Sequence, residues 1–343
     1  MAASIPRIGA LAAGPLDSIA DVAGVTVGHC TLAQDAVQTG VTVIRPHGGD
    51  PYRDKVPAAA TVLNGFGKSV GLVQVEELGV LETPVALTNT FAVGAVAQAQ
   101  IRAAVAANPE IGRALPTVNP LVFECNDGYL NDIQRMAVES RHYEAALAGA
   151  SHEVAQGAVG AGRGMSAFGV KGGIGTASRL AGGHCVGALV LANFGMPESL
   201  TVAGRLLGPE LAQRLAGPAA QPEKGSIIMI LATDAPLDAR QLRRLSLRAG
   251  AGLARTGSVF GHGSGDLALA FSTAYTVPHD AARPMPALAM LHESRLDPLF
   301  RAAADSVEQA ILHALWHAET VPGRDGHCRR ALLDVMPEAG KAA

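Results

Sequence analysis

The chain has 343 residues, 48% of them hydrophobic and 17% charged, which is enough to build a large core in one large domain or two average ones. Its formal net charge is −3 and no block of Lys or Arg stands out, which argues against a nucleic-acid partner. The cysteines form no C-x-x-C pair and no zinc or disulfide spacing, so we expect reduced thiols in a cytoplasmic protein. They are Cys30, Cys125, Cys185 and Cys328.

The N-terminal residues lack a basic start followed by a long apolar run, so we expect no signal peptide. The best candidate for a membrane span, Pro84 to Ile101, lacks charge but carries polar residues such as Asn89 and Gln98. This pattern favours a buried strand followed by a helix, and we expect no membrane partner.

Apolar and β-branched runs predict strands along the whole chain. They cover residues 22–31, 37–45, 59–63, 85–88, 118–124, 186–192, 226–233 and 266–274. Three stretches predict helices from their composition, stop signals and apolar spacing. They cover residues 91–107, 238–255 and 298–319.

Residues 157–183 contain ten glycines, and we expect a long functional loop there. Residues 208–224, rich in Pro and Ala, indicate a surface excursion. Several strands follow one another without regular βαβ repetition, which predicts a layered α/β fold with mixed or antiparallel sheets. No linker or repeat divides the chain, so we expect a single domain over residues 1–343.

The stretch TGSVFGHGSGDLALAF, residues 256–271, places Ser264 between glycines at the mouth of an apolar strand. A serine in a Gly-rich turn is by itself unremarkable. Here, however, Gly263 offers a carbonyl that a hydroxyl can approach without a Cβ clash. The following strand is a rigid support for a reactive side chain.

This arrangement allows Ser264 to act as an N-terminal nucleophile. Attack on the Gly263 carbonyl, followed by hydrolysis of the ester, would give a new N-terminal serine whose α-amine has a pKa of about 8. That amine can serve as the general base for its own hydroxyl. We do not assign His262 to a catalytic triad, because it would remain on the upstream fragment.

The chain resembles the L-aminopeptidase/D-esterase family, which includes β-peptidyl aminopeptidases and is related to the nylon-oligomer hydrolases. The matching segments run in one order over nearly the whole chain. They are SIADVAGVTVGHCT, GVTVIRPHGG, VLNGFGKSVGLVQVEELG, ETPVALTNT, ECNDGYLNDI, GVKGGIGTASR, GSIIMILATDAPL and LARTGSVFGHGSGDLALAFSTA.

The resemblance implies an α/β/β/α sandwich with mixed sheets. It implies a precursor that cuts itself between Gly263 and Ser264 into residues 1–263 and 264–343. It also implies hydrolysis of N-terminal residues from small peptides, amides or esters with a free amine, including β-peptides and D-amino-acid derivatives. A homo-oligomer of processed pairs is expected.

By the same resemblance, the S-x-E pair at Ser306 and Glu308 joins the proton-transfer chain and holds the substrate ammonium. Asn193, after an apolar strand, matches a residue that stabilises the oxyanion. Tyr129 matches an active-site tyrosine. Lys171 has a counterpart in the nylon hydrolases, although it could instead neutralise a nearby carboxylate.

We expect no cofactor and no metal. The tripeptide GHC occurs at residues 28–30, 183–185 and 326–328, but these spacings match no zinc pattern. His313 and His317 lack the Glu of H-E-x-x-H, and KGGIGTAS fails the phosphate-loop spacing. Two alternatives remain open: acyl transfer to an amine acceptor, and a ligand-binding protein that is never processed.

Overall fold

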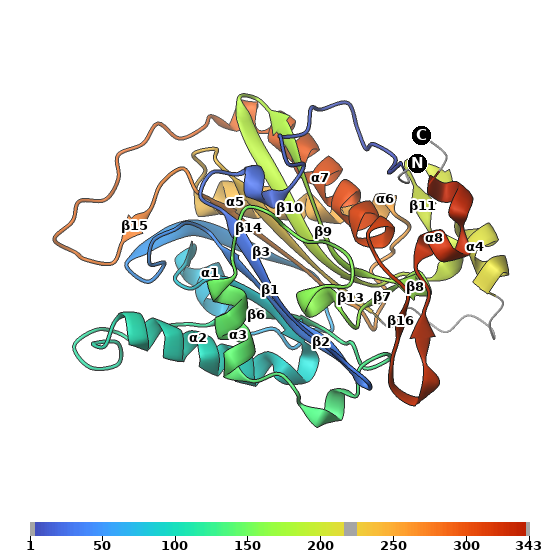
Figure 1. The fold of residues 1–343 in the computed structure, drawn as a ribbon. Coiled ribbons are helices and arrows are strands. Elements are labelled where there is room, and N and C mark those ends of the chain that lie inside the picture. Colours follow the sequence, from blue (N-terminus) through green and yellow to red (C-terminus); the bar gives the residue numbers. More distant parts are fainter. Residues whose placement is uncertain (1–3, 216–224, 341–343) are drawn as a thin grey trace.

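A computed structural model describes residues 4–215 and 225–340 and shows two β-sheets packed face to face (Figure 1). The smaller sheet has four strands in the order β1-β2-β5-β6. They are β1 (Thr26–Gln34), β2 (Val37–Arg45), β5 (Val85–Asn89) and β6 (Leu121–Cys125). Its β1–β2 and β2–β5 pairs are antiparallel and its β5–β6 pair is parallel, so the sheet is mixed.

The larger sheet has seven strands, in the order β15-β3-β14-β13-β10-β9 with β4 beside β3. They are β3 (Asp54–Gly65), β4 (Val80–Leu81), β9 (Gly173–Ala181), β10 (His184–Asn193), β13 (Ser226–Thr233), β14 (Gly265–Ser272) and β15 (Val277–Pro278). Only β13 and β14 pair in parallel. Short hairpins are formed by β7 (Ser166–Ala167) with β8 (Val170–Lys171), β11 (Thr201–Val202) with β12 (Arg205–Leu206), and β16 (Val321–Pro322) with β17 (Cys328–Arg329).

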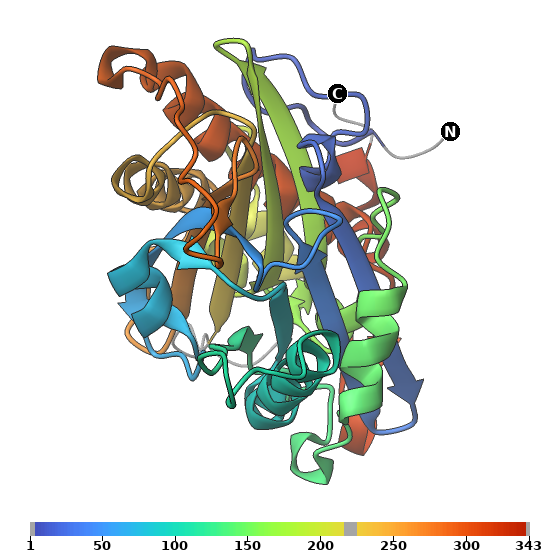
Figure 2. The same ribbon diagram turned by 90° about the vertical axis from the view of Figure 1, so that its left-hand side faces the viewer.

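Helices cover the outer face of each sheet, as the two views show (Figures 1 and 2). The helices are α1 (Leu72–Leu78), α2 (Val93–Ala107), α3 (Ser140–Ala148), α4 (Gly208–Leu215), α5 (Ala239–Leu247), α6 (Ala249–Arg255), α7 (Asp297–Trp316) and α8 (Leu332–Val335). Alternating residues of the strands face different cores. For example, Leu267 and Leu269 lie between the sheets, whereas Ala268 and Ala270 lie beneath α5, α6 and α7. This is the expected α/β/β/α sandwich.

The expectation of a loop across the Gly-rich segment 157–183 is partly wrong, because its second half is the buried strand β9. Glycine is required there by packing: a Cβ on Gly175 would lie 1.9 Å from the Ala310 carbonyl oxygen of α7. The predicted helix over residues 238–255 is two helices, α5 and α6, which meet at Arg248. Part of the predicted excursion, residues 208–215, is α4, and the rest of it lies outside the described residues.

Thr90–Ala107 is long and apolar enough to cross a membrane, with a mean hydropathy of 1.2. This criterion uses only length and composition, and many helices in protein cores also meet it. Here Val93, Val96 and Ala99 share a hydrophobic cluster with Val43 of β2, so α2 belongs to the outer layer over the smaller sheet.

Substitution Gly175→Ala should lower the free energy of unfolding by about 1–3 kcal/mol, because the added methyl group overlaps the α7 backbone. The control is Gly94→Ala in α2, where a Cβ meets nothing within 4 Å and alanine favours the helix. Thermal unfolding of both variants measures the effect. A Gly175→Ala protein as stable as wild type would contradict this packing.

Candidate active site

Three neighbouring strands of the larger sheet, β10, β13 and β14, have ends that lie side by side along one border of the sheet. This border of strand ends is called the edge below. Asn193 at the end of β10 is paired with Ser226 at the start of β13, and Ser226 is paired with Gly265 at the start of β14. Because neighbouring strands are about 4.8 Å apart, Asn193 lies roughly 10 Å from Gly265. The sheet register therefore brings Ser264 and Asn193 to the same edge.

Ser264 is completely buried, and its hydroxyl donates to Asp266 Oδ1 at 2.5 Å. Residues two apart on a strand share a face, which explains why the carboxylate lies beside the hydroxyl. The backbone is equally well held: Gly265 N donates to Gly225 O at 3.2 Å and to Ser226 Oγ at 3.1 Å. The Ser264 hydroxyl is thus held by a hydrogen bond to a buried carboxyl group.

Asn193 is buried and its amide joins two loops at the same edge. Its Oδ1 accepts from Ser166 N at 2.9 Å, and its Nδ2 donates to Asn126 O at 3.1 Å. One of the two Nδ2 hydrogens is therefore committed to the loop that follows β6.

Tyr129 lies in that loop, with 38% of its surface exposed. Its ring stacks on His327 with centroids 4.5 Å apart, and Arg329 Cζ lies 3.6 Å from the centroid. Arg329 Nε donates to Ser166 Oγ at 3.2 Å, and Ser166 contacts Asn193. Tyr129 is thus linked to this edge through neighbours that the sequence did not single out.

Lys171 is fully buried, and its Nζ donates to the carbonyl oxygens of Gly162 at 2.7 Å and Gly172 at 3.0 Å. Burial, and next the nearby Arg163 charge, hold the pKa of Lys171 well below its usual value. The Lys171 amino group donates to backbone carbonyls and so holds the Gly-rich loop, and no carboxylate among the described residues forms an ion pair with it.

Ser306 and Glu308 are not brought together with Ser264, contrary to expectation. Ser306 Oγ donates to Val186 O at 3.1 Å. Val186 precedes Asn193 by seven residues on β10, which at about 3.3 Å per residue places it roughly 23 Å away. The sequence predicted α7 correctly but could not show which end of the sheet its S-x-E segment covers.

Glu308 instead forms an ion pair with Arg255 of α6, in which Arg255 Nη1 lies 3.4 Å from Glu308 Oε2. Burial raises the pKa of Glu308 despite the opposing effect of Arg255. This carboxylate therefore belongs to the packing of α6 against α7.

Glu124 at the end of β6 is a buried carboxylate that the sequence analysis missed. Its Oε1 accepts from Lys68 N at 2.8 Å, and its Oε2 accepts from the Thr90 hydroxyl. A Cβ on Gly67 would lie 3.7 Å from Glu124 Oε1 and 3.9 Å from Gly265 Cα, so Gly67 is close to both. The feature of the sequence that could have indicated Glu124 is that it is the one acidic residue in an otherwise apolar strand.

Within the described residues, no three His, Cys, Asp or Glu side chains gather closely enough to hold a metal ion. His313 Nδ1 lies 2.6 Å from Thr176 O, and His317 Nδ1 lies 2.9 Å from His313 O. These histidines therefore bond to backbone carbonyls.

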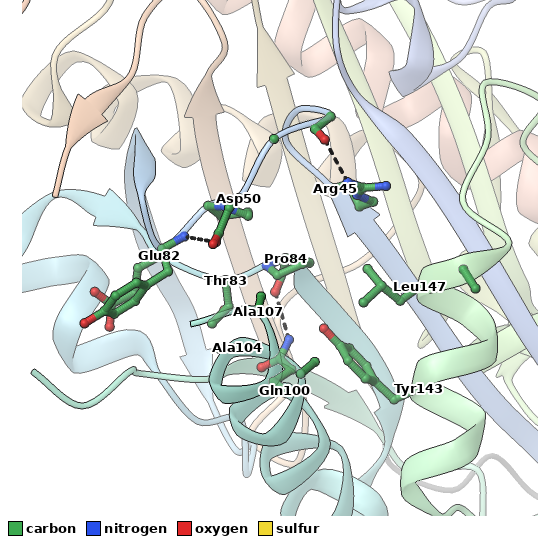
Figure 3. Close-up of a pocket in the computed structure, with 16 residues that line it drawn as sticks. Arg45, Asp50, Glu82, Thr83, Pro84, Gln100, Ala104, Ala107, Tyr143 and Leu147 are labelled. Atoms are coloured by element: carbon green, nitrogen blue, oxygen red, sulfur yellow. Dashed lines mark hydrogen bonds between the residues drawn. The ribbon is translucent and has the colours of Figure 1, made fainter. Parts of the chain in front are cut away.

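A cavity of 530 Å³ lies between α2, α3 and the loop before β3 (Figure 3). It opens beside Pro84, at the end of β5 remote from Asn89 and Glu124. Two polar side chains that line it form hydrogen bonds within the protein: Gln100 Nε2 donates to Pro84 O, and Glu82 Oε1 accepts from Asn119 N. The cavity is therefore separate from the edge that carries Ser264.

Solved structures with the same architecture identify the class of protein. The β-aminopeptidase of Burkholderia sp. superposes with a TM-score of 0.88 at 42% identity, over 97% of each chain. The L-aminopeptidase D-Ala-esterase/amidase of Ochrobactrum anthropi, described as a variant of the Ntn hydrolase fold, superposes with a TM-score of 0.88 at 34% identity, over 99% of this chain and 98% of its own. The fold is thus that of an Ntn-type hydrolase.

The sequence places the chain within one peptidase family. Residues 17–329 match the model of peptidase family S58. The β-peptidyl aminopeptidase BapA of Sphingosinicella xenopeptidilytica is 38% identical over 335 residues, which cover 90% of this chain and 83% of BapA. The chain belongs to peptidase family S58, and the predicted resemblance and enzyme class are confirmed.

Asp127, beside Asn126, generates a prediction about pH. Its carboxylate is fully buried, and burial raises its pKa from 3.8 to about 7. Between these values the folded chain keeps a proton that the unfolded chain has lost, so this group destabilises the fold as pH rises toward 7.

Asp127→Asn removes the ionisation and keeps the shape. In a Ser264→Ala background, the variant should gain on the order of 4 kcal/mol of unfolding free energy near pH 8, and the gain should vanish near pH 4. Urea unfolding across this range measures it. Two stability curves that stay parallel at all pH values would rule out the buried ionisation.

Proposed function

We propose that this S58 peptidase is a self-processing serine aminopeptidase whose nucleophile is Ser264. One observation supports it above all others: the buried Ser264 hydroxyl donates to Asp266 at 2.5 Å while adjoining the Gly263 carbonyl in the chain. A hydroxyl bonded to a carboxylate is prepared to lose its proton on attack.

Self-cleavage proceeds in two steps, acyl transfer to the hydroxyl and hydrolysis of the ester. Ser264 Oγ attacks the Gly263 carbonyl carbon, Asp266 takes the hydroxyl proton, and the proton passes to the Ser264 nitrogen as the C–N bond breaks. Water then hydrolyses the ester, giving a Gly263 carboxylate and restoring the hydroxyl. The products are residues 1–263 and 264–343.

The mature enzyme uses the α-amine of Ser264 as general base, since its pKa of about 8 suits proton transfer near neutral pH. The acyl-enzyme formed with substrate is then hydrolysed by water. Asn193, at the same edge, is the proposed oxyanion donor through its Nδ2 group. Tyr129 and Lys171 support the loops of this edge.

Glu124 replaces Glu308 as the proposed site for the substrate ammonium, because it is a buried carboxylate close to the start of β14: a Cβ on Gly67 would lie 3.7 Å from Glu124 Oε1 and 3.9 Å from Gly265 Cα. A carboxylate and an ammonium form a charge-assisted hydrogen bond. The substrates proposed are small peptides, amides and esters with a free amine. The named relatives support including β-amino-acid and D-amino-acid derivatives.

Two further properties belong to the proposal. The chain is proposed to be cytoplasmic, which its four free cysteines support. It is proposed to form a homo-oligomer of processed pairs, which the exposed apolar residues Met285, Leu288 and Met290 support, since they lie on the long excursion that follows β15 (Figure 1).

No observation favours acyl transfer over hydrolysis, and adding an acceptor amine followed by product analysis distinguishes them. Membership of a peptidase family argues against a ligand-binding protein without turnover.

Wild-type protein should convert from a 35.0 kDa chain into two fragments, and Ser264→Ala should remain intact and inactive. Intact-mass spectrometry and hydrolysis of L-, D- and β-aminoacyl p-nitroanilides measure both properties. An uncut wild type, with amidase activity undiminished in Ser264→Ala, would contradict the proposal.

Asp266→Asn should slow self-cleavage by roughly 10²–10⁴-fold, because an amide cannot accept the hydroxyl proton as a carboxylate does. Asp50→Asn is the matched control, since Asp50 also accepts hydrogen bonds but lies at the cavity remote from Ser264. Time courses of fragment formation compare the two. Equal rates for both variants and wild type would remove Asp266 from the mechanism.

A further inference from the structure

Asn64, near the end of β3, holds the segment that contains the proposed cleavage site. It is paired with Asp266 across the β3–β14 ladder. Its Nδ2 donates to Gly261 O at 2.8 Å, contacts His262 O at 3.4 Å, and also donates to Ser264 O. One amide group therefore holds carbonyls on both sides of the Gly263–Ser264 bond.

The same segment is bent into a tight turn. Ser264 N donates to Gly261 O at 2.9 Å, which places the proposed scissile bond between the third and fourth residues of the turn. Phe66 N adds a hydrogen bond of 3.2 Å to Ser264 O. The Gly263 carbonyl itself accepts no hydrogen bond from residues 4–215 and 225–340, so it remains free for attack.

The chain that leads into the turn is strained. Phe260 has a φ of 55°, in the left-handed region that a bulky side chain rarely adopts. Such a conformation costs on the order of 1–3 kcal/mol and persists only where surrounding contacts impose it. The Asn64 contacts to Gly261 and His262 directly follow Phe260 and are suited to impose it.

We propose that Asn64 is the positioning residue for self-cleavage: its amide fixes the turn so that the Gly263 carbonyl carbon stays within reach of Ser264 Oγ. This inference rests on the proposed function. It assigns Asn64 no contact with the reacting atoms. Its role is to restrict the turn, and displacement of reacting groups by about 1 Å can slow a reaction about 100-fold.

The role is expected to differ between precursor and mature enzyme. After cleavage, Gly261 and His262 lie on the new C-terminal tail of the first fragment, and their contacts with Asn64 are no longer needed. Only the bond to Ser264 O remains relevant. Loss of the amide should therefore slow processing much more than turnover.

The test uses the full-length chain with two substitutions. Asn64→Ala removes the side-chain donor, and Asn64→Asp keeps the shape but offers only acceptors. Fragment formation is followed by intact mass after pulsed synthesis, and kcat/KM is expressed per cleaved chain. Both variants should process about 100-fold more slowly, with kcat/KM within about tenfold of wild type. Val62→Ala on the same strand is the control, because Val62 is half-exposed and should process normally.

Folding is measured separately by thermal unfolding of each Asn64 substitution combined with Ser264→Ala. Wild-type processing rates in both Asn64 variants would overturn the inference and leave the proposed function intact. A large fall in Tm, with processing and turnover reduced equally, would make Asn64 a structural residue and also overturn it. Failure of wild type to cut between Gly263 and Ser264 would instead refute the proposed function.

Discussion

The hydrogen bond between the Ser264 hydroxyl and the Asp266 carboxylate is the interaction on which the whole site depends. It exists because β14 lies between β3 and β13, and the start of the strand cannot shift without breaking a ladder on each side. Both side chains are fully buried, and a hydrogen bond is stronger in such surroundings than in water. The sheet register therefore determines the chemistry of the serine.

The other proposed functional groups lie at the same edge because each stands at or near the end of a strand. Asn193 closes β10, Asn64 stands near the end of β3, and Glu124 closes β6 of the smaller sheet. A glycine allows two of these ends to meet, since a Cβ on Gly265 would lie only 3.0 Å from Gly67 Cα and from Phe66 O. Side chains held by strand ends are positioned more accurately than side chains on free loops.

Much of the fold could be predicted from the sequence, because strand and helix periodicities are local properties. The Gly-rich strand β9 could not be predicted, because the need for glycine at Gly175 comes from its contact with α7, which is distant in the sequence. Ser264 was proposed as a site residue because it directly precedes an apolar strand. Once that strand is known, the sequence Ser264-Gly265-Asp266 shows that the serine and the carboxylate lie on the same face. Asn64 and Glu124 were missed because the roles proposed for them depend on which strand ends face each other.

The Ser306–Glu308 pair shows that a correct local prediction can still give a wrong location in the fold. A short S-x-E match and an amphipathic helix were both read correctly as local features, yet α7 places the pair near Val186, at the other end of β10. Two residues more than 40 positions from Ser264 in the chain cannot be assigned to its site by motif alone. Glu308 instead contacts Arg255, which stabilises the packing of two helices.

The claim that the chain creates its own catalytic N-terminus is tested most directly by N-terminal sequencing of purified, active enzyme. The account predicts two sequences in equal amount, that of the first fragment and Ser-Gly-Asp-Leu beginning at Ser264. Active enzyme that yields only the N-terminus of the intact chain would contradict it.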